Sequence, residues 1–217
     1  MATFAVIHGA GDVGSSWDLV AAELRERGHE VVAPDLPCED DSAGLAEYSQ
    51  TVVDALGDSE DVVVVAHSLG GFTAPLVAAA RPVELLVLTS AMVPLPGEAA
   101  GDWWDHTGYP AADGDEIALF FHDLPRDQAR EALAKGRDQS GTPMREPWPL
   151  DAWPDVPTRF LLFADDRWHP ADWMRGVVRD RLGIEPDEMP GSHGAYLSQP
   201  RELAERLDGY QRSTLGH

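Results

Sequence analysis

Four consecutive valines, Val62–Val65, lead directly into the stretch AHSLGG, and this run restricts the possible folds more than any other feature of the chain. A run that is apolar at every position is typical of a strand buried on both faces, as in a parallel sheet covered by helices. Similar apolar runs occur at 3–8, 31–34, 83–91 and 158–164, and amphipathic helices are predicted between the first four runs. This alternation predicts an α/β layered fold whose strands end at a common edge, where ligands usually bind.

The regular alternation breaks after the fourth apolar run. Residues 92–157 are rich in proline, glycine, tryptophan and acidic side chains, and the strand pattern resumes only at Thr158. A total of 217 residues fits one domain, so we expect a single domain over 1–217 with a small cap inserted at about 92–157, above the strand ends. Helices in and after this segment are predicted at 114–124, 126–137, 171–182 and 200–210.

The formal net charge of −22 argues against two classes of partner. Such a surface repels nucleic-acid phosphates and anionic lipids, so neither nucleic-acid binding nor membrane binding is expected. Cys38 is the only cysteine, which allows no internal disulfide and no cysteine metal cluster. The N-terminus lacks a signal-peptide pattern, and no run approaches the roughly 18 apolar residues of a membrane span. We expect a cytoplasmic protein, and the single lysine, Lys135, among many arginines indicates a GC-rich, bacterial source.

Ser68 follows the valine run at the point where a strand is predicted to turn sharply into a helix. Such a turn needs small residues two positions before and two positions after the serine, because strand and helix backbones nearly touch. Ala66 and Gly70 occupy those positions, and Gly71 adds room. The pattern is G-x-S-x-G with alanine first, and it predicts a nucleophilic serine at the sheet edge. The alternative is a plain helix N-cap serine.

A serine hydroxyl needs a base to act as a nucleophile, and the base needs an orienting carboxylate. Asp165 and Asp166 directly follow the apolar run 158–164, and His193 lies in a glycine-flanked loop before the last predicted helix. The order Ser, Asp, His is the one expected for α/β-hydrolases. We expect a catalytic triad of Ser68, Asp166 and His193. Asp166 is preferred because a proline four residues on opens a helix, and Asp165 is left as a turn residue.

The oxyanion of an acyl-transfer intermediate needs two N–H donors. One is expected at Leu69, directly after the nucleophile, and the other at Ala10, in the loop after the first strand. Gly9 and Gly11 would let this loop approach the site. The same loop also matches the dinucleotide-binding pattern G-x-G-x-x-G, with Asp35 near the required acidic position. That alternative explains neither the serine turn nor the later aspartate and histidine.

Several stretches together resemble the small serine α/β-hydrolases, and in particular the branch with plant methyl-ketone, salicylate-methyl-ester and hydroxynitrile-processing enzymes and their bacterial relatives. The resemblance implies the fold, the triad and the oxyanion hole on the residues named above. Two departures are Ala66 in place of the commoner glycine, and a chain that begins at the family's third strand. The implied fold is therefore an α/β-hydrolase fold with a minimal six-stranded, mostly parallel sheet and helices on both faces. The stretches are VIHGAGDVGSSWDLVAAELRERGHEVVAPDLP, VAHSLGGFTAPLVA, DDRWHPADWMRGVVRDRLGI and GSHGAYLSQPRELAERL.

The resemblance also indicates the reaction. The related hydroxynitrile lyases carry a threonine at the position of Gly9 and a lysine at that of Gly194, so both positions here match the esterase pattern. A nucleophilic serine, rather than an aspartate, argues against dehalogenase and epoxide hydrolase chemistry. We expect a serine hydrolase that cleaves a small, apolar or aromatic carboxylic ester through an acyl-enzyme. The alternatives are a lyase, cyclase or acyltransferase on the same scaffold, or a receptor-like ligand-binding protein.

Aromatic side chains of the cap region are the candidates for the substrate pocket. Trp103, Trp104, His122 and Trp168 are predicted to contact the substrate, although each could instead pack the cap onto the domain. The histidines lack the H-x-H and H-x-x-x-H spacings of metal sites, so no metal and no cofactor are expected. The expected partner is a small ester-like substrate, with the chain a monomer or homodimer.

Overall fold

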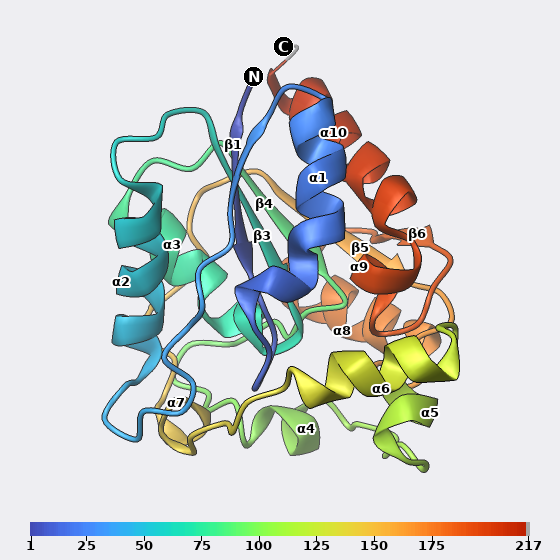
Figure 1. The fold of residues 1–217 in the computed structure, drawn as a ribbon. Coiled ribbons are helices and arrows are strands. Elements are labelled where there is room, and N and C mark those ends of the chain that lie inside the picture. The colour runs from blue at the N-terminus through green and yellow to red at the C-terminus, as the bar shows by residue number, and fades with distance from the viewer. Residues whose placement is uncertain (216–217) are drawn as a thin grey trace.

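The computed structural model describes residues 1–215, and its centre is one six-stranded sheet (Figure 1). The strands lie in the order β2-β1-β3-β4-β5-β6, and every adjacent pair among the described residues is parallel. The predicted α/β sheet with six strands is confirmed, and it is parallel throughout where we expected it to be mostly parallel. The strands are β1 (Thr3–Ile7), β2 (Glu30–Val32), β3 (Val62–His67), β4 (Leu85–Thr89), β5 (Thr158–Phe163) and β6 (Asp187–Met189).

Helices cover both faces of the sheet, which explains the unbroken valine run of β3. Because side chains alternate along a strand, Val62 and Val64 face one layer of helices, and Val63 and Val65 face the other. The first layer contains α2 (Leu45–Leu56), α3 (Ala74–Ala80) and α8 (Ala171–Leu182). The second contains α1 (Asp18–Glu26), α9 (Ala195–Ser198) and α10 (Pro200–Leu215).

The segment between β4 and β5 holds four short helices beyond the carboxyl ends of the strands (Figure 1). Two of them fall where helices were predicted, but they are shorter. The first is capped by Asp115 and ends at Phe120, and the second ends at Ala134, just before Gly136. Two short 3₁₀ helices, Gly14–Trp17 and Ser68–Phe72, follow β1 and β3 at the same edge. The four helices of the segment are α4 (Trp103–His106), α5 (Glu116–Phe120), α6 (Arg126–Ala134) and α7 (Thr142–Arg145).

The helices of residues 1–215 were also compared with the requirements of a membrane span. None of them is both long enough and apolar enough to cross a bilayer.

Candidate active site

Ser68 is the first residue after β3, and its backbone is strained. Its φ is +52°, a left-handed value that non-glycine residues rarely adopt and that persists only where the surroundings impose it. A Cβ on Gly70 would lie 2.8 Å from the carbonyl oxygen of Ile7, and one on Gly71 would overlap the carbonyl oxygen of Met92. The Met92 N–H also donates to the Ser68 carbonyl at 2.9 Å. The two glycines therefore allow the close backbone approach that the sequence pattern predicted.

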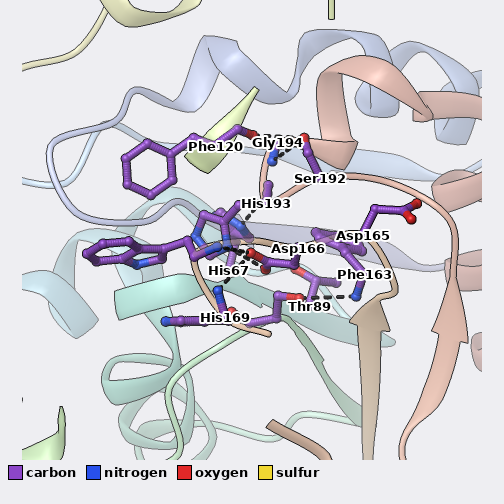
Figure 2. Close-up of polar contacts among 12 residues, drawn as sticks. His67, Thr89, Phe120, Phe163, Asp165, Asp166, His169, Ser192, His193 and Gly194 are labelled. Carbon is purple, nitrogen blue, oxygen red and sulfur yellow. Dashed lines mark hydrogen bonds and ion pairs between the residues drawn. The ribbon is translucent and has the colours of Figure 1, made fainter. Parts of the chain in front are cut away.

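Asp166 and His193 form a buried pair on loops that follow β5 and β6 (Figure 2). Nδ1 of His193 donates to Oδ2 of Asp166 at 2.7 Å, and Oδ1 of Asp166 accepts the backbone N–H groups of Trp168 and His169, each at 2.8 Å. Burial by itself raises the pKa of Asp166. The charge and hydrogen bond of His193, with contacts from His169, outweigh burial and hold this pKa below its ordinary value. The carboxylate thus fixes the proton on Nδ1 and leaves the lone pair of a neutral His193 on Nε2.

Asp165 has a different role from its neighbour. Its side chain is exposed, and Oδ2 accepts the N–H of Gly191 at 3.0 Å, while its own N–H donates to the Gly191 carbonyl at 3.1 Å. Figure 2 shows its carboxylate directed away from His193. Asp165 thus ties the end of β5 to the loop that carries the histidine, and Asp166 is the aspartate paired with that histidine.

Ser68 and His193 line one cavity of about 630 Å³, together with the two predicted oxyanion donors, Ala10 and Leu69. The loop after β1 passes directly against the serine, because a Cβ on Gly9 would lie 3.0 Å from Cβ and 3.6 Å from Oγ of Ser68. All five residues assigned to the triad and the oxyanion hole from sequence therefore converge at one edge of the sheet. Their catalytic roles remain predictions.

The four predicted substrate contacts divide into two pairs. Trp104 and Trp168 line the cavity, with ring centroids 5.2 Å apart. Trp103 does not, because it is fully buried and its indole N–H donates to the Val93 carbonyl at 3.0 Å. His122 also lies outside, since its Nε2 donates to the Asp165 carbonyl at 2.8 Å and its ring borders a separate, shallow groove. Trp103 and His122 therefore do not line the cavity that holds Ser68, and their assignment as substrate contacts stays a prediction.

His67, directly before the nucleophile, contacts the backbone of the catalytic-loop histidine. It is fully buried, its Nε2 donates to the His193 carbonyl at 3.0 Å, and the two rings lie 4.4 Å apart. Burial, with a smaller effect from the charges of His193 and His169, holds the pKa of His67 well below its ordinary value. A neutral His67 therefore holds the backbone of His193 through this hydrogen bond. The position of His67 at the end of a buried strand could have suggested such a contact.

His169 is a second buried histidine beside the pair. Its Nδ1 donates to the Ser90 carbonyl at 2.8 Å, and its ring meets that of His193 edge to face at 4.9 Å. Burial, and then the charge of His193, lowers the pKa of His169 to about 3. Phe120 and Phe121, which precede His122 in the aromatic stretch LFFHDLP, also line the cavity.

Asp166, His169 and His193 are close enough to hold a metal ion, with one ligand atom of each within 4.8 Å of the others. Most of the possible ligand atoms already take part in hydrogen bonds, whereas Nε2 of the buried His169 has no partner among residues 1–215. Both carboxylate oxygens of Asp166 accept hydrogen bonds, and Nδ1 of His169 donates to Ser90. The hydrogen bond between Asp166 and His193 is the one that a proton-transfer pair needs.

Comparisons with known proteins agree with this geometry. The model of the alpha/beta hydrolase family matches residues 4–206. A "probable esterase" of rice (Oryza sativa subsp. indica) is 34% identical, with 94% of each chain covered. A pyrethroid hydrolase of Sphingobium wenxiniae is 26% identical, with 93% of this chain and 85% of that protein covered. The crystal structure of a pyrethroid hydrolase from Sphingobium faniae has a TM-score of 0.83 at 22% identity and covers 100% of this chain and 99% of that one.

The chain therefore belongs to the alpha/beta hydrolase family. These relatives place it among the carboxylic ester hydrolases of the family, in the branch of esterases and methylesterases. The family resemblance predicted from the sequence motifs is confirmed.

Proposed function

We propose that this chain hydrolyses small carboxylic esters with an apolar or aromatic acyl group through an acyl-enzyme on Ser68. The observation that carries the proposal is the orientation of His193. Its Nδ1 is held by Asp166, and the ring lines the same cavity as the serine, so Nε2 is available as the base. Ester-hydrolysing relatives that match over nearly the whole chain support the reaction class.

The proposed reaction uses each group in turn. Nε2 of His193 accepts the proton of Ser68 as Oγ attacks the ester carbonyl, and the N–H groups of Ala10 and Leu69 stabilise the oxyanion. The imidazolium then protonates the leaving alcohol, and the acyl group stays on Ser68. Water, deprotonated by His193, releases the acid and restores the serine. Asp166 holds the tautomer and stabilises the transient positive charge throughout.

The cavity walls support an apolar or aromatic acyl group. Trp104, Phe120, Phe121 and Trp168 contribute aromatic surface close to Ser68 and His193. A cavity of about 630 Å³ lies within the range of small-molecule sites. We propose that residues 92–157 act as a cap, because this segment supplies three of the five Phe, Tyr and Trp residues that line the cavity.

The lack of room for a side chain at Gly9 favours hydrolysis over lyase chemistry. A side chain there would press on Ser68, since even a Cβ would lie 3.0 Å from the serine Cβ. The lyases that this branch resembles carry a threonine at this position. The backbone here is fitted to glycine, in agreement with an esterase.

The test is hydrolysis of a panel of p-nitrophenyl esters, before and after treatment with a fluorophosphonate, with the adduct located by mass spectrometry. We expect turnover that labelling of Ser68 abolishes, and no turnover or label in Ser68→Ala with its thermal midpoint preserved. Labelling without hydrolysis of any ester would shift the assignment to a lyase, a transferase or a binding protein. Wild-type rates in Ser68→Ala would refute the role of the serine.

The cytoplasmic location and the monomer or homodimer state stay predictions. Fractionation of the native host's cells and sedimentation of the purified chain would test them.

A further inference from the structure

A short piece of the cap segment, residues 136–139, crosses the loop that follows β1. The Arg137 N–H donates to the Gly11 carbonyl at 2.6 Å, and the Gly11 N–H donates to Oε1 of Gln139 at 3.1 Å. Gly11 has a φ of +61°, and a Cβ there would lie 2.5 Å from the Arg137 carbonyl oxygen. The two backbones therefore meet at a distance that only glycine permits.

The side chain of Arg137 binds the same loop a second time. Its Nε and Nη2 donate to the Asp12 carbonyl at 3.0 and 2.6 Å, and its Nη1 donates to the Leu36 carbonyl at 3.0 Å. Nη2 also donates to Nε2 of His8 at 3.2 Å, and Nδ1 of His8 donates to the Gly9 carbonyl at 2.8 Å. The guanidinium thus holds the loop at Asp12 directly and at Gly9 through His8, on either side of Ala10.

The positive charge of Arg137 is not used in an ion pair. Within residues 1–215, no carboxylate lies within ion-pair distance of its guanidinium, and all its hydrogen-bond partners are neutral. The nearby carboxylate of Asp12 is instead held by the Val13 N–H, the Ser16 hydroxyl and the Tyr196 hydroxyl. The arginine therefore directs its donors to the carbonyls of Asp12 and Leu36 and to the ring of His8.

We infer that Arg137 is a positioning residue, which holds the oxyanion loop (residues 9–12) from the cap and thereby keeps the Ala10 N–H aimed at the reacting carbonyl. This inference rests on the proposed function. A loop with two glycines among four residues has many backbone conformations open to it, and hydrogen bonds at Gly9, Gly11 and Asp12 remove most of them. Stabilisation of the oxyanion then depends on the contact between the cap segment and this loop.

The consequence for the rate follows from the geometry that an oxyanion hole requires. Donors act at hydrogen-bond distance from the developing oxyanion, and a 1 Å misplacement costs about 10²-fold in rate. Without the Arg137 side chain, this segment holds the loop only through the Arg137 backbone N–H and Gln139, so the loop should open more often. We therefore expect Arg137→Ala to lower kcat by about 10- to 100-fold and to leave KM nearly unchanged.

The experiment compares Arg137→Ala and Arg137→Lys with Arg130→Ala, which removes an exposed arginine of α6 from the same segment. We measure kcat and KM with a p-nitrophenyl ester, and the thermal midpoint of each variant. Lysine keeps the charge but offers fewer directed donors, so we expect an intermediate kcat. Added guanidinium ion, at millimolar and non-denaturing concentration, should raise the kcat of Arg137→Ala and not that of the wild type. Arg130→Ala should behave as the wild type.

Hydrogen exchange separates this inference from the proposed function. Exchange at the Gly11 amide, which Gln139 holds, should be slow in the wild type and faster in Arg137→Ala, whether or not any ester is hydrolysed. A wild type that neither hydrolyses esters nor reacts with a fluorophosphonate would refute the proposed function, and the exchange data would still test the support of the loop. Unchanged exchange, an unchanged kcat, or a raised KM with an unchanged kcat would overturn the positioning role.

Discussion

Replacing Asp166 with asparagine is the sharpest test of the proposed triad, because the structure dictates how the new amide must sit. Oδ1 of Asp166 accepts two backbone N–H groups, from Trp168 and His169. Only the amide oxygen of an asparagine can replace that acceptor, so its NH₂ group must face Nδ1 of His193. Nδ1 must then accept a hydrogen bond, and the proton moves to Nε2. In that tautomer, His193 cannot accept the proton of Ser68.

The expected loss is large, because the variant loses both the correct tautomer and the charge beside the imidazolium. In a serine triad this change lowers kcat by about 10⁴, equivalent to about 5.5 kcal/mol of activation free energy. The neighbour provides a matched control, since Asp165→Asn removes one carboxylate charge at the same strand end and leaves the His193 contact intact.

The assay is steady-state hydrolysis of one p-nitrophenyl ester by the wild type and both variants, with far-UV circular dichroism and a thermal midpoint for each. We expect Asp165→Asn to stay close to the wild-type kcat and Asp166→Asn to fall by the factor above. Equal losses in the two variants, with both folded, would refute the assignment of Asp166 as the orienting carboxylate. A fully active Asp166→Asn would refute the tautomer argument itself.

Two further perturbations test other parts of the site. Gly9→Thr should displace the loop, because the new Cβ would meet Ser68. We expect kcat to fall by about 10²–10³, as it does when an oxyanion donor is lost. An unchanged rate of ester hydrolysis would exclude Ala10 as a donor. His169→Asn should make stability less sensitive to acid. The pKa of His169 is about 3 in the folded chain and about 6.5 in the unfolded chain. Below pH 6.5 the unfolded chain takes up a proton that the folded chain does not. The free energy of unfolding therefore falls as the pH falls from 6.5 toward 3. At pH 4.5 the loss is on the order of 3 kcal/mol. Urea unfolding at pH 7 and 4.5 should show the wild type losing more stability than His169→Asn, in which the amide can still donate to Ser90. Equal losses would contradict the buried, neutral histidine.

Most of the fold could be predicted because short stretches of the sequence carry the patterns of its strands and turns. The valines of β3 are buried on both faces, so their run carries no alternation, and only a sheet covered twice explains them. The same strand leads into Ser68, and the two glycines after it leave room for the backbone carbonyls of Ile7 and Met92. The small-residue pattern of such a turn indicates this close approach without naming the partners. Asp166 and His193 could be placed because parallel strands bring their carboxyl ends to one edge.

The segment between β4 and β5 could not be predicted in the same way, because no repeating strand pattern fixes its side chains. Trp103 and Trp104 are neighbours in α4, but successive residues of a helix point about 100° apart, so one is buried and the other lines the cavity. His122 lies just past α5 and turns toward the Asp165 carbonyl. Arg137 gave no signal at all, since its partners at Asp12 and Leu36 are 125 and 101 residues away in the chain.

If Arg137 supports the oxyanion loop as inferred, residues 92–157 cannot be exchanged as an independent module. Recombination that replaced residues 92–157 with the equivalent segment of a relative would bring new aromatic walls, and it would also remove Arg137 and Gln139 from Gly11 and Asp12. Chimaeras of this kind should gain new substrates together with slower turnover, whereas crossovers that retain residues 136–139 should keep their speed. Substrate range and turnover rate should then change together when this segment is replaced. Related enzymes should diverge through substitutions elsewhere in residues 92–157 that keep the contact of residues 136–139 with the loop after β1.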